Sequence, residues 1–183
     1  GDAYAIPLLG AHQLKNAAVV IETVKVLRER GWKLAQEDVE HGLYAVSWPA
    51  RFEVVADEPF FVVDGGHNPQ CAQTVADNLK NYFPGTRRVL LMGVLADKDY
   101  MTMTDILNEA ADEYVCVTPD SPRALPAAKL GECLARFGKK VSVADSIRDG
   151  VGMAIDAAAG GGMVCAVGSL YMAGEIRGCF GLK

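Results

Sequence analysis

The amino-acid sequence predicts an α/β fold, a three-layer αβα sandwich built on a mostly parallel sheet of about six strands. Two observations predict it. From residue 60 onward, short apolar, β-prone runs alternate with stretches of helical length. Such alternation is typical of parallel strands joined by right-handed helical crossovers, with helices on both faces of the sheet. Half of the 183 residues are hydrophobic, which is enough apolar material for a substantial core.

The first part of the chain is expected to be helical. Residues 12–30 have apolar side chains at helical spacing, and Gly31 is a typical end signal for that helix. A short helical turn and a connection are expected over residues 34–44. A β-prone run then begins at Phe52, and we expect residues 52–56 to form an antiparallel strand at one edge of the sheet. The apolar stripe of the first helix consists of Ala17, Val20, Ile21, Val24 and Leu27.

The remaining elements follow from the alternating pattern. Strands are expected at 60–63, 88–92, 113–118, 140–143 and 163–167. Helices are expected between them, at 69–82, 100–111, 126–137 and 147–159, and a final stretch from Leu170 closes the chain. Helix starts are indicated by Pro126 and Ser146, and helix ends by Gly138 and Gly160.

The junction after the strand at 60–63 has the clearest functional signal. Residues 64–67, Asp-Gly-Gly-His, follow the strand, and Asn68 and Pro69 are a preferred cap and first residue of a helix. Open parallel sheets bind ligands beyond the carboxyl ends of their strands. Glycines there let the backbone approach a ligand, and a helix N-terminus favours anions. The junction therefore indicates a small polar or nucleotide site at Asp64 and His67; the alternative is a well-capped turn without a ligand.

Two polar residues earlier in the chain are further candidates. Arg51 follows a rigid Trp-Pro pair and precedes a strand, so its guanidinium is well placed for a phosphate; the alternative is an ordinary surface arginine. Asn16 lies in the first turns of a helix, where its residue type adds nothing to helix stability. Its amide could recognise the edge of a base, or it could be a buried amide that bridges helix and loop.

Two later strand ends are also followed by polar groups. Asp97, Lys98 and Asp99 follow the strand at 88–92 and could hold a zwitterion, although Asp99 is equally explained as a helix cap. Ser169 follows the strand at 163–167 and places a hydroxyl at a helix start. Because a parallel sheet gathers the carboxyl ends of its strands on one edge, we expect these groups to form one site.

Composition argues against several other classes of protein. The formal net charge of −5 argues against nucleic acid as the main ligand. No apolar run approaches the roughly 20 residues of a membrane span, and the first residues lack the marks of a signal peptide, so we expect a cytoplasmic protein. The five cysteines are odd in number and form no CxxC, which predicts reduced thiols and no metal site. Neither a GxGxxG after the first strand nor a GxxxxGK[ST] occurs.

Five segments, in this order and spacing, resemble the C-terminal part of folylpolyglutamate synthases, members of the Mur ligase superfamily that are often bifunctional with dihydrofolate synthase in bacteria. They are LGAHQLKNAAVVIETVKVL, WPARFEVV, VVDGGHNPQCA, GVLADKD and GSLYMAGEIR. The resemblance implies that the sandwich is a Rossmann-like Mur ligase C-terminal domain. The His12–Gln13 pair and the GSLY segment favour the folate branch over the cell-wall ligases.

Two positions depart from the commoner family pattern. Ala50 stands in WPAR where WPGR is commoner, and Gly66 stands in DGGHNP where DGAHNP is commoner. We interpret the extra glycine as loosening its loop.

The resemblance implies ATP-dependent amide formation. ATP phosphorylates a carboxylate of the folate, and the amino group of L-glutamate then attacks the acyl phosphate. On the matching positions, the resemblance implies that Asn16 contacts the adenine, Arg51 reaches the phosphates and Asp64 holds the ribose. It also implies that His67 lies near the phosphates and that Ser169 lines the same cleft.

The incoming glutamate is implied to bind near Asp97 or Lys98. In the family, the P-loop and the Mg²⁺ ligands belong to an N-terminal domain that has no counterpart in this sequence. We therefore expect residues 1–45 to be the tail of the central ATPase domain and residues 46–183 to be the C-terminal domain. On this expectation the isolated chain is inactive, has no metal ligands and binds ATP very weakly.

Several interpretations stay open at this point. The full-length enzyme is expected to be a monomer that uses ATP, folate and L-glutamate, whereas the isolated chain is expected to self-associate through its first helix. One alternative is a bifunctional dihydrofolate synthase or another Mur-type amide ligase. The other is a non-catalytic module that binds a nucleotide or an amino acid.

Overall fold

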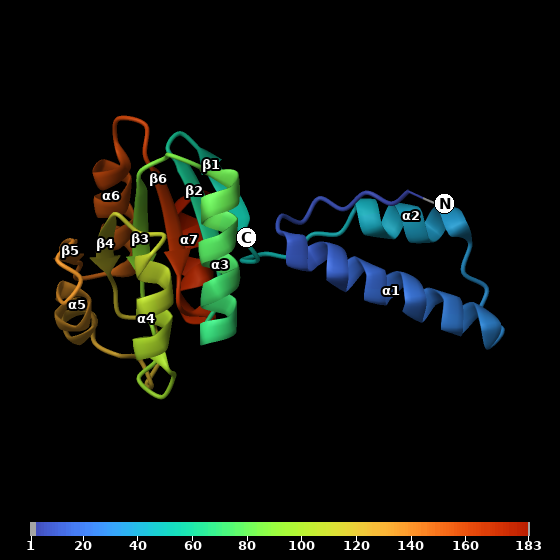
Figure 1. Cartoon of the computed structure of the whole chain (residues 1–183), viewed down its shortest axis with the longest axis horizontal. Coiled ribbons are helices and arrows are strands. Elements are labelled where there is room, and N and C mark those ends of the chain that lie inside the picture. Colours follow the sequence, from blue (N-terminus) through green and yellow to red (C-terminus); the bar gives the residue numbers. More distant parts are fainter. Residues whose placement is uncertain (1–2, 183) are drawn as a thin grey trace. The chain divides into compact units, whose positions relative to one another are not determined.

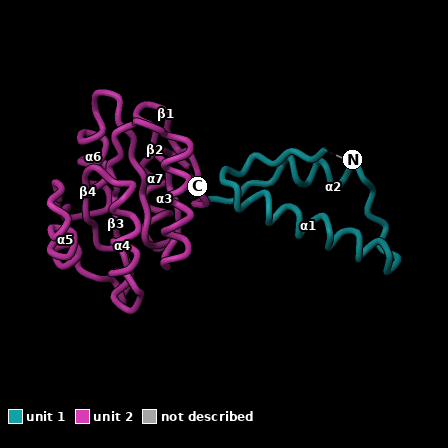
Figure 2. The backbone as a smooth tube through the Cα atoms, viewed as in Figure 1, with its two compact units in different colours: residues 1–49 teal, residues 50–183 magenta. Residues whose placement is uncertain are grey.

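The computed structural model describes residues 3–182, and the chain divides into two compact units between Pro49 and Ala50 (Figure 2). The first unit contains two helices, α1 (Ala11–Glu29) and α2 (Gln36–Tyr44) (Figure 1). They are joined by Arg28 of α1, whose Nε donates to Leu34 O at 2.8 Å and whose Nη1 donates to Gln36 Oε1 at 3.2 Å. Both predicted helical stretches of this unit are therefore confirmed.

The second unit is built on one six-stranded sheet in the order β1-β2-β6-β3-β4-β5. The strands β2 (Phe60–Asp64), β6 (Met163–Val167), β3 (Arg88–Met92), β4 (Glu113–Cys116) and β5 (Lys140–Val143) are parallel. Strand β1 (Glu53–Asp57) pairs with β2 in the antiparallel direction and lies at the edge. The predicted α/β class, mostly parallel sheet and antiparallel edge strand are confirmed.

Helices cover both faces of this sheet (Figure 1). Helices α6 (Ile147–Ala158) and α7 (Ala173–Cys179) pack on the face formed by alternate strand residues, because successive side chains of a strand point to opposite faces. These core residues include Phe61, Val63, Val89, Leu91, Val115, Val164 and Ala166. Helices α3 (Pro69–Tyr82), α4 (Tyr100–Asn108) and α5 (Ala127–Ala135) belong to the other layer.

Three helix starts agree with the caps expected from the sequence. Asn68 Oδ1 accepts from Cys71 N at 2.9 Å, Asp99 Oδ1 accepts from Thr102 N at 3.2 Å, and Ser146 Oγ accepts from Asp149 N at 3.0 Å. Each bond satisfies a backbone N–H that the first turn of a helix leaves without an intrahelical partner.

Some element ends differ from the expected ones. Helix α4 ends at Asn108 instead of residue 111, because the chain tightens there into 3₁₀-type bonds such as Ala110 N to Leu107 O at 2.9 Å. Helix α5 ends at Ala135 in the same way, with Gly138 N bonded to Ala135 O at 3.1 Å. Strand β4 ends at Cys116, the last residue that pairs with β5.

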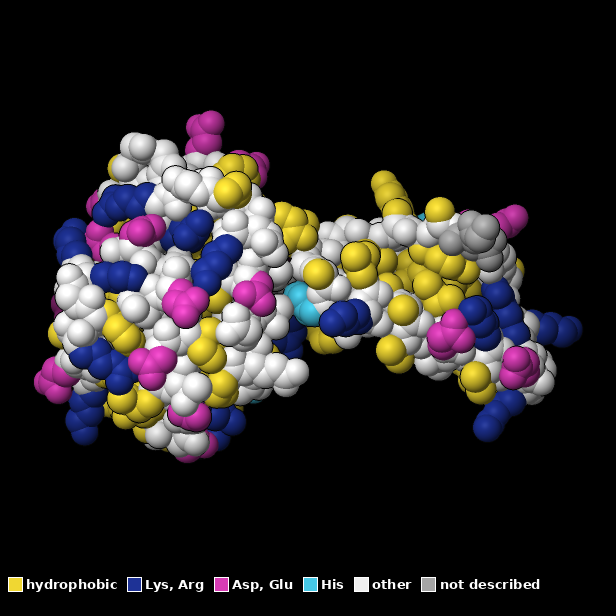
Figure 3. All heavy atoms as spheres, in the orientation of Figure 1, with side chains coloured by type: hydrophobic (Ala, Val, Ile, Leu, Met, Phe, Trp, Pro, Cys, Tyr) yellow, Lys and Arg dark blue, Asp and Glu magenta, His cyan; other side chains and the backbone are white. Residues whose placement is uncertain are grey.

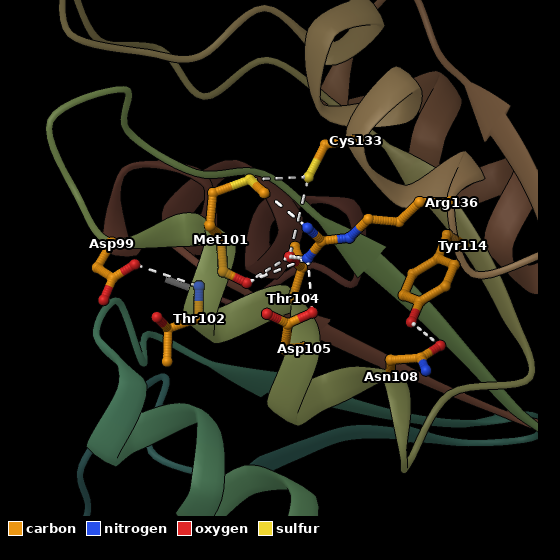
Figure 4. Close-up of polar contacts among 9 residues, drawn as sticks. All are labelled: Asp99, Met101, Thr102, Thr104, Asp105, Asn108, Tyr114, Cys133 and Arg136. Carbon is orange, nitrogen blue, oxygen red and sulfur yellow. Dashed lines mark hydrogen bonds and ion pairs between the residues drawn. The ribbon is translucent and has the colours of Figure 1, made fainter.

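Arg136, at the end of α5, joins this helix to α4 (Figure 4). Its Nη2 donates to Thr104 Oγ1 at 3.0 Å and to Asp105 Oδ1 at 2.7 Å, and it reaches Met101 O at 3.3 Å. The sulfur of Cys133, also on α5, lies 3.3 Å from Met101 Sδ. One guanidinium thus holds the first turns of α4 against the end of α5.

The cysteines and the helices bear on two further expectations from the sequence. All five cysteines are free thiols, as predicted. Across residues 3–182, none of the helices combines the length and the apolar character that a membrane crossing requires.

Candidate functional site

The predicted site residues of the second unit meet at one edge of the sheet. Asp64, at the end of β2, is in register with Val167 of β6, and Val167 is in register with Met92 of β3. The loops that follow these three strands therefore leave the sheet side by side. Strand β1 is antiparallel, with Glu53 opposite Val63, so the segment before it, which includes Arg51, enters at the same edge.

Arg51 lies in a tight turn with unusual backbone geometry. Its neighbours Ala50 and Phe52 have φ angles of 56° and 47°, in the left-handed region that non-glycine residues rarely adopt. Hydrogen bonds hold the turn from three sides. Ala50 N donates to Glu53 Oε2 at 2.8 Å, Gly65 N donates to Ala50 O at 2.8 Å, and Phe52 N donates to Asp64 Oδ2 at 2.9 Å.

Asp64 ties this turn to the glycine loop after β2. Its Oδ2 accepts from Phe52 N, and its Oδ1 accepts from Gly66 N at 2.7 Å. The sequence predicted a ligand-binding acid, and the structure adds a structural task that the sequence did not indicate. Both oxygens of this carboxylate therefore hold backbone N–H groups of the site edge.

His67 is oriented by its own loop. Its Nδ1 lies 3.0 Å from Gly65 O. Because a carbonyl oxygen only accepts, Nδ1 carries a proton, and in the neutral ring Nε2 is the acceptor. The loop therefore fixes both the orientation and the tautomer of the imidazole.

Gly66 lies in a narrow space in this structure. A Cβ at this position would lie 2.8 Å from Asp64 Oδ1 and 2.9 Å from the Cβ of Cys71. Both distances are shorter than ordinary carbon contacts, so an alanine would force the carboxylate or the start of α3 to move. The space around Gly66 is thus narrow, and the expected loosening of the loop by this glycine stays a prediction.

Ser169 is buried behind the site edge, with 2% of its surface exposed. It caps a short 3₁₀ turn, η1 (Leu170–Met172), and its Oγ accepts from Tyr171 N at 3.2 Å. The expected hydroxyl at a helix start is confirmed. Its predicted contact with a nucleotide stays a prediction.

Asp97 pairs with an arginine that sequence reasoning missed. Arg123 Nη1 lies 2.7 Å from Asp97 Oδ2, and its Nη2 lies 3.5 Å from the hydroxyl of Tyr171. These bonds, first the one to Tyr171 and then the one to Asp97, raise the pKa of Arg123. Lys98 is adjacent and half-buried. The only signal for Arg123 was its position in the loop that follows β4.

Asn16 lies on α1, in the first compact unit. Its Nδ2 donates to Gln13 Oε1 at 3.0 Å. Asn16 is exposed and Gln13 is buried, so the alternative of a buried amide at position 16 is wrong.

Comparison with known proteins identifies the family. The sequence profile described as "Mur ligase, glutamate ligase domain" matches residues 50–170, which begin at the first residue of the second unit and include all of its strands. The chain therefore belongs to the Mur ligase family and contains its glutamate ligase domain.

The similar curated proteins are folate ligases. The chain is 36% identical over 177 residues to the folylpolyglutamate synthase of Lacticaseibacillus casei, a match that covers 94% of this chain and 39% of that protein. It is 31% identical over 172 residues to the dihydrofolate synthase/folylpolyglutamate synthase of Bacillus subtilis, covering 93% and 39%. The chain thus spans well under half the length of these relatives.

Solved structures agree with this assignment. The folylpolyglutamate synthase of Mycobacterium tuberculosis, complexed with ADP and AMPPCP, superposes with a TM-score of 0.88 at 31% identity. That match covers 100% of this chain and 44% of the solved chain. The Thermotoga maritima folylpolyglutamate synthase superposes with a TM-score of 0.79 at 25% identity, covering 99% and 41%.

Proposed function

We propose that this chain is the C-terminal part of an ATP-dependent folylpolyglutamate synthase, which adds L-glutamate to folate through an acyl phosphate. The observation that carries the proposal is the meeting of Arg51, His67 and the Asp97–Arg123 pair at one sheet edge. The names of the similar proteins support the reaction, and the ADP and AMPPCP complexes of the Mycobacterium tuberculosis relative support the nucleotide.

The proposed chemistry gives a role to each residue that is proposed to contact ATP. A carboxylate is a poor electrophile until phosphorylation provides it with a good leaving group. Arg51 stabilises phosphate oxygens while the phosphoryl group moves to the folate carboxylate. His67 directs Nε2, the ring nitrogen that is not bonded to Gly65 O, toward the phosphates. The remaining assignments are Asp64 to the ribose, Asn16 to the adenine and Ser169 to the wall of the cleft.

The proposed glutamate-binding region contains both anionic and cationic side chains. Glutamate brings one ammonium and two carboxylates, so it needs an anionic and a cationic partner. Asp97 fits the ammonium, and Lys98 fits a carboxylate. Arg123 holds Asp97 in place at 2.7 Å and adds a second cation beside Lys98.

Magnesium is assigned to another part of the enzyme. When bound, Mg²⁺ neutralises phosphate charge during transfer. Within residues 3–182, no three or more His, Cys, Asp or Glu side chains are grouped so that they could hold a metal. The donors described here therefore do not fit a resident Mg²⁺, and we propose that its ligands lie in the part of the relatives that this chain does not span.

The test is a glutamate-addition assay on the full-length protein. We expect ATP-dependent addition of labelled glutamate to tetrahydrofolate. We expect Arg51→Ala and His67→Ala each to lower kcat/KM by at least about 100-fold, since each removes a group from the phosphate site. Arg148→Ala, which removes an exposed arginine of α6, is the matched control and should keep full activity.

The same assay separates the alternatives. Formation of dihydrofolate in parallel would assign the second activity that the name of the Bacillus subtilis relative includes. Absence of activity with every folate, in a folded full-length protein, would contradict the proposal and favour another amide ligase of the family.

A further inference from the structure

An ion pair between distant parts of the chain lies directly behind the Arg51 turn. Arg177 of α7 contacts Glu53 Oε1 at the start of β1, and the two residues are 124 positions apart. The Arg177 side chain is 12% exposed and that of Glu53 is 25% exposed. Such shielding makes this pair less screened by salt than the exposed pairs of the same unit, such as Lys80 with Glu109.

The second oxygen of Glu53 holds the turn itself. Glu53 Oε2 accepts from Ala50 N at 2.8 Å, whereas Oε1 is held by Arg177. One carboxylate therefore connects α7 to the backbone of the residue before Arg51. Because Arg177 holds Oε1, it restrains the rotation of this carboxylate and therefore the position of Oε2, to which Ala50 N donates.

The turn needs such support because its backbone is strained. Ala50 and Phe52, on either side of Arg51, both have left-handed φ angles, which cost free energy for residues with a Cβ. Conformations of this kind persist only where the surroundings hold them. Glu53 holds the residue before Arg51, and Asp64 holds the residue after it.

We propose that Glu53 and Arg177 are positioning residues that hold the Arg51 turn in the conformation that binds phosphate. The inference rests on the proposed function, because it assumes that Arg51 contacts the nucleotide. Arg177 acts on Arg51 through Glu53 and the Ala50 amide. Without this support, the turn relaxes toward right-handed φ angles and the guanidinium of Arg51 leaves the phosphate.

The test compares Michaelis constants in the full-length ligase. Arg177→Met and Glu53→Ala should raise KM for ATP by about 10-fold to 100-fold, because small displacements of a positioned group have effects of this size. KM for glutamate should stay unchanged. Arg177→Lys, which keeps the charge and is the milder change, should recover part of the loss. Glu109→Gln removes the exposed pair with Lys80 and is the matched control.

A second measurement, amide hydrogen exchange, reports on the conformation of the Arg51 turn independently of enzyme activity. Amide hydrogen exchange should become faster at Ala50 in both Arg177→Met and Glu53→Ala, because Ala50 N loses its acceptor or its fixed direction. The amide of Phe52, held by Asp64, should change less and serves as an internal reference. The double variant should raise KM for ATP no further than the worse single variant, since both changes break the same connection.

The outcomes separate this inference from the proposed function. If Arg51→Ala raises KM for ATP but Arg177→Met and Glu53→Ala leave it unchanged, the positioning role is wrong and the proposed function stands. If Arg51→Ala itself has no effect on KM for ATP, the nucleotide assignment fails and the inference fails with it. A lower yield of folded enzyme with unchanged KM would show a merely structural role and overturn the proposal.

Discussion

Gly168 is the residue at which two loops of the site edge come closest to each other. It follows β6 with φ of 116°, and a Cβ placed on it would lie 2.4 Å from the carbonyl oxygen of Gly93, in the loop after β3. That neighbour is backbone, which cannot rotate away as a side chain can. Only glycine therefore allows both loops to leave the sheet next to each other.

We expect Gly168→Ala to destabilise the protein more than Gly160→Ala. Both glycines have positive φ, so each alanine costs about 1–2 kcal/mol for its backbone conformation. Gly160 has open space around it, whereas Gly168 adds a backbone clash worth about 1–3 kcal/mol more. Urea denaturation of both variants measures the difference. Equal losses would contradict the close approach of Gly168 and Gly93.

Cys116 predicts a loss of stability at high pH. Burial, and secondarily the nearby Cys133, raises the pKa of the Cys116 thiol from 9.0 to about 12. The folded protein therefore keeps the proton above pH 9, whereas the unfolded chain releases it. This contribution to stability is complete below pH 9 and is lost between pH 9 and pH 12, at up to about 1.4 kcal/mol per pH unit.

The check is the pH dependence of the free energy of unfolding in Cys116→Ala. The variant should lose less stability per pH unit above pH 9 than the original protein, although it is less stable at neutral pH. Cys165, whose pKa burial also raises, stays in both proteins and contributes equally to both curves. Identical slopes would show that Cys116 ionises in the folded state.

At the scale of elements, Arg136 makes three of the polar contacts between α4 and the end of α5. Arg136 makes its bonds from the end of one helix to the first two turns of another, and its guanidinium also lies 4.6 Å from the ring centre of Phe137. Asp105 is largely exposed, so the ion pair contributes little, and the bond to the buried Thr104 contributes more.

We expect Arg136→Met to destabilise the second unit by about 1–2 kcal/mol, because Thr104 and Met101 O lose a donor. Lys80→Met, which removes the exposed pair between Lys80 of α3 and Glu109, the residue that follows α4, should cost less than about 0.5 kcal/mol. Thermal or chemical unfolding of the two variants makes the comparison. A larger effect at Lys80 would contradict this account.

Local signals explain which elements could be predicted from the sequence. The bounds of α3, β3, β5 and β6 agree with the prediction, because apolar runs and caps such as Asn68 depend only on near neighbours. The ends of α4 and α5 could not be predicted, since 3₁₀ bonds close them without a glycine or proline at the last helical residue.

The sheet edge that carries the candidate residues was predictable, but their ion pairs were not. The rule that parallel strands end at one edge predicted that Asp64, Asp97 and Ser169 follow strands at the same edge, and the register of β2, β6 and β3 agrees. Arg123 and Arg177 lie 26 and 124 residues from their partners Asp97 and Glu53, and no pattern in the sequence relates such distant charges. Their pairing follows from strand order, which depends on the whole sheet.

At the scale of the whole molecule, the first unit exposes an apolar surface on α1, visible as yellow side chains in Figure 3. A groove of about 450 Å³ lies along this helix, lined by Ala18, Val19, Glu22, Thr23 and Val26. Val19 is 66% exposed and Leu14 is 65% exposed. Apolar surface of this kind favours association.

We expect the isolated chain to self-associate through this face of α1, because association buries the exposed valines. Val19→Lys should shift the chain toward the monomer in analytical ultracentrifugation. Glu29→Lys, on the same helix and outside the groove, is the control and should leave the association constant within about threefold of the original. A monomer at every concentration would contradict this prediction.

The place of β6 in the sheet has a consequence for the order of folding. Among the strands of residues 3–182, β6 is the last to be synthesised, yet it lies between β2 and β3 and pairs with both. Until residue 163 has been made, the described strands can form only a β1–β2 hairpin and a separate β3–β4–β5 group. Since pairing over such long separations is slow, closure of the sheet is expected to be a late, rate-limiting event. A nascent chain therefore exposes the open edges of β2 and β3 to its surroundings until β6 has been made.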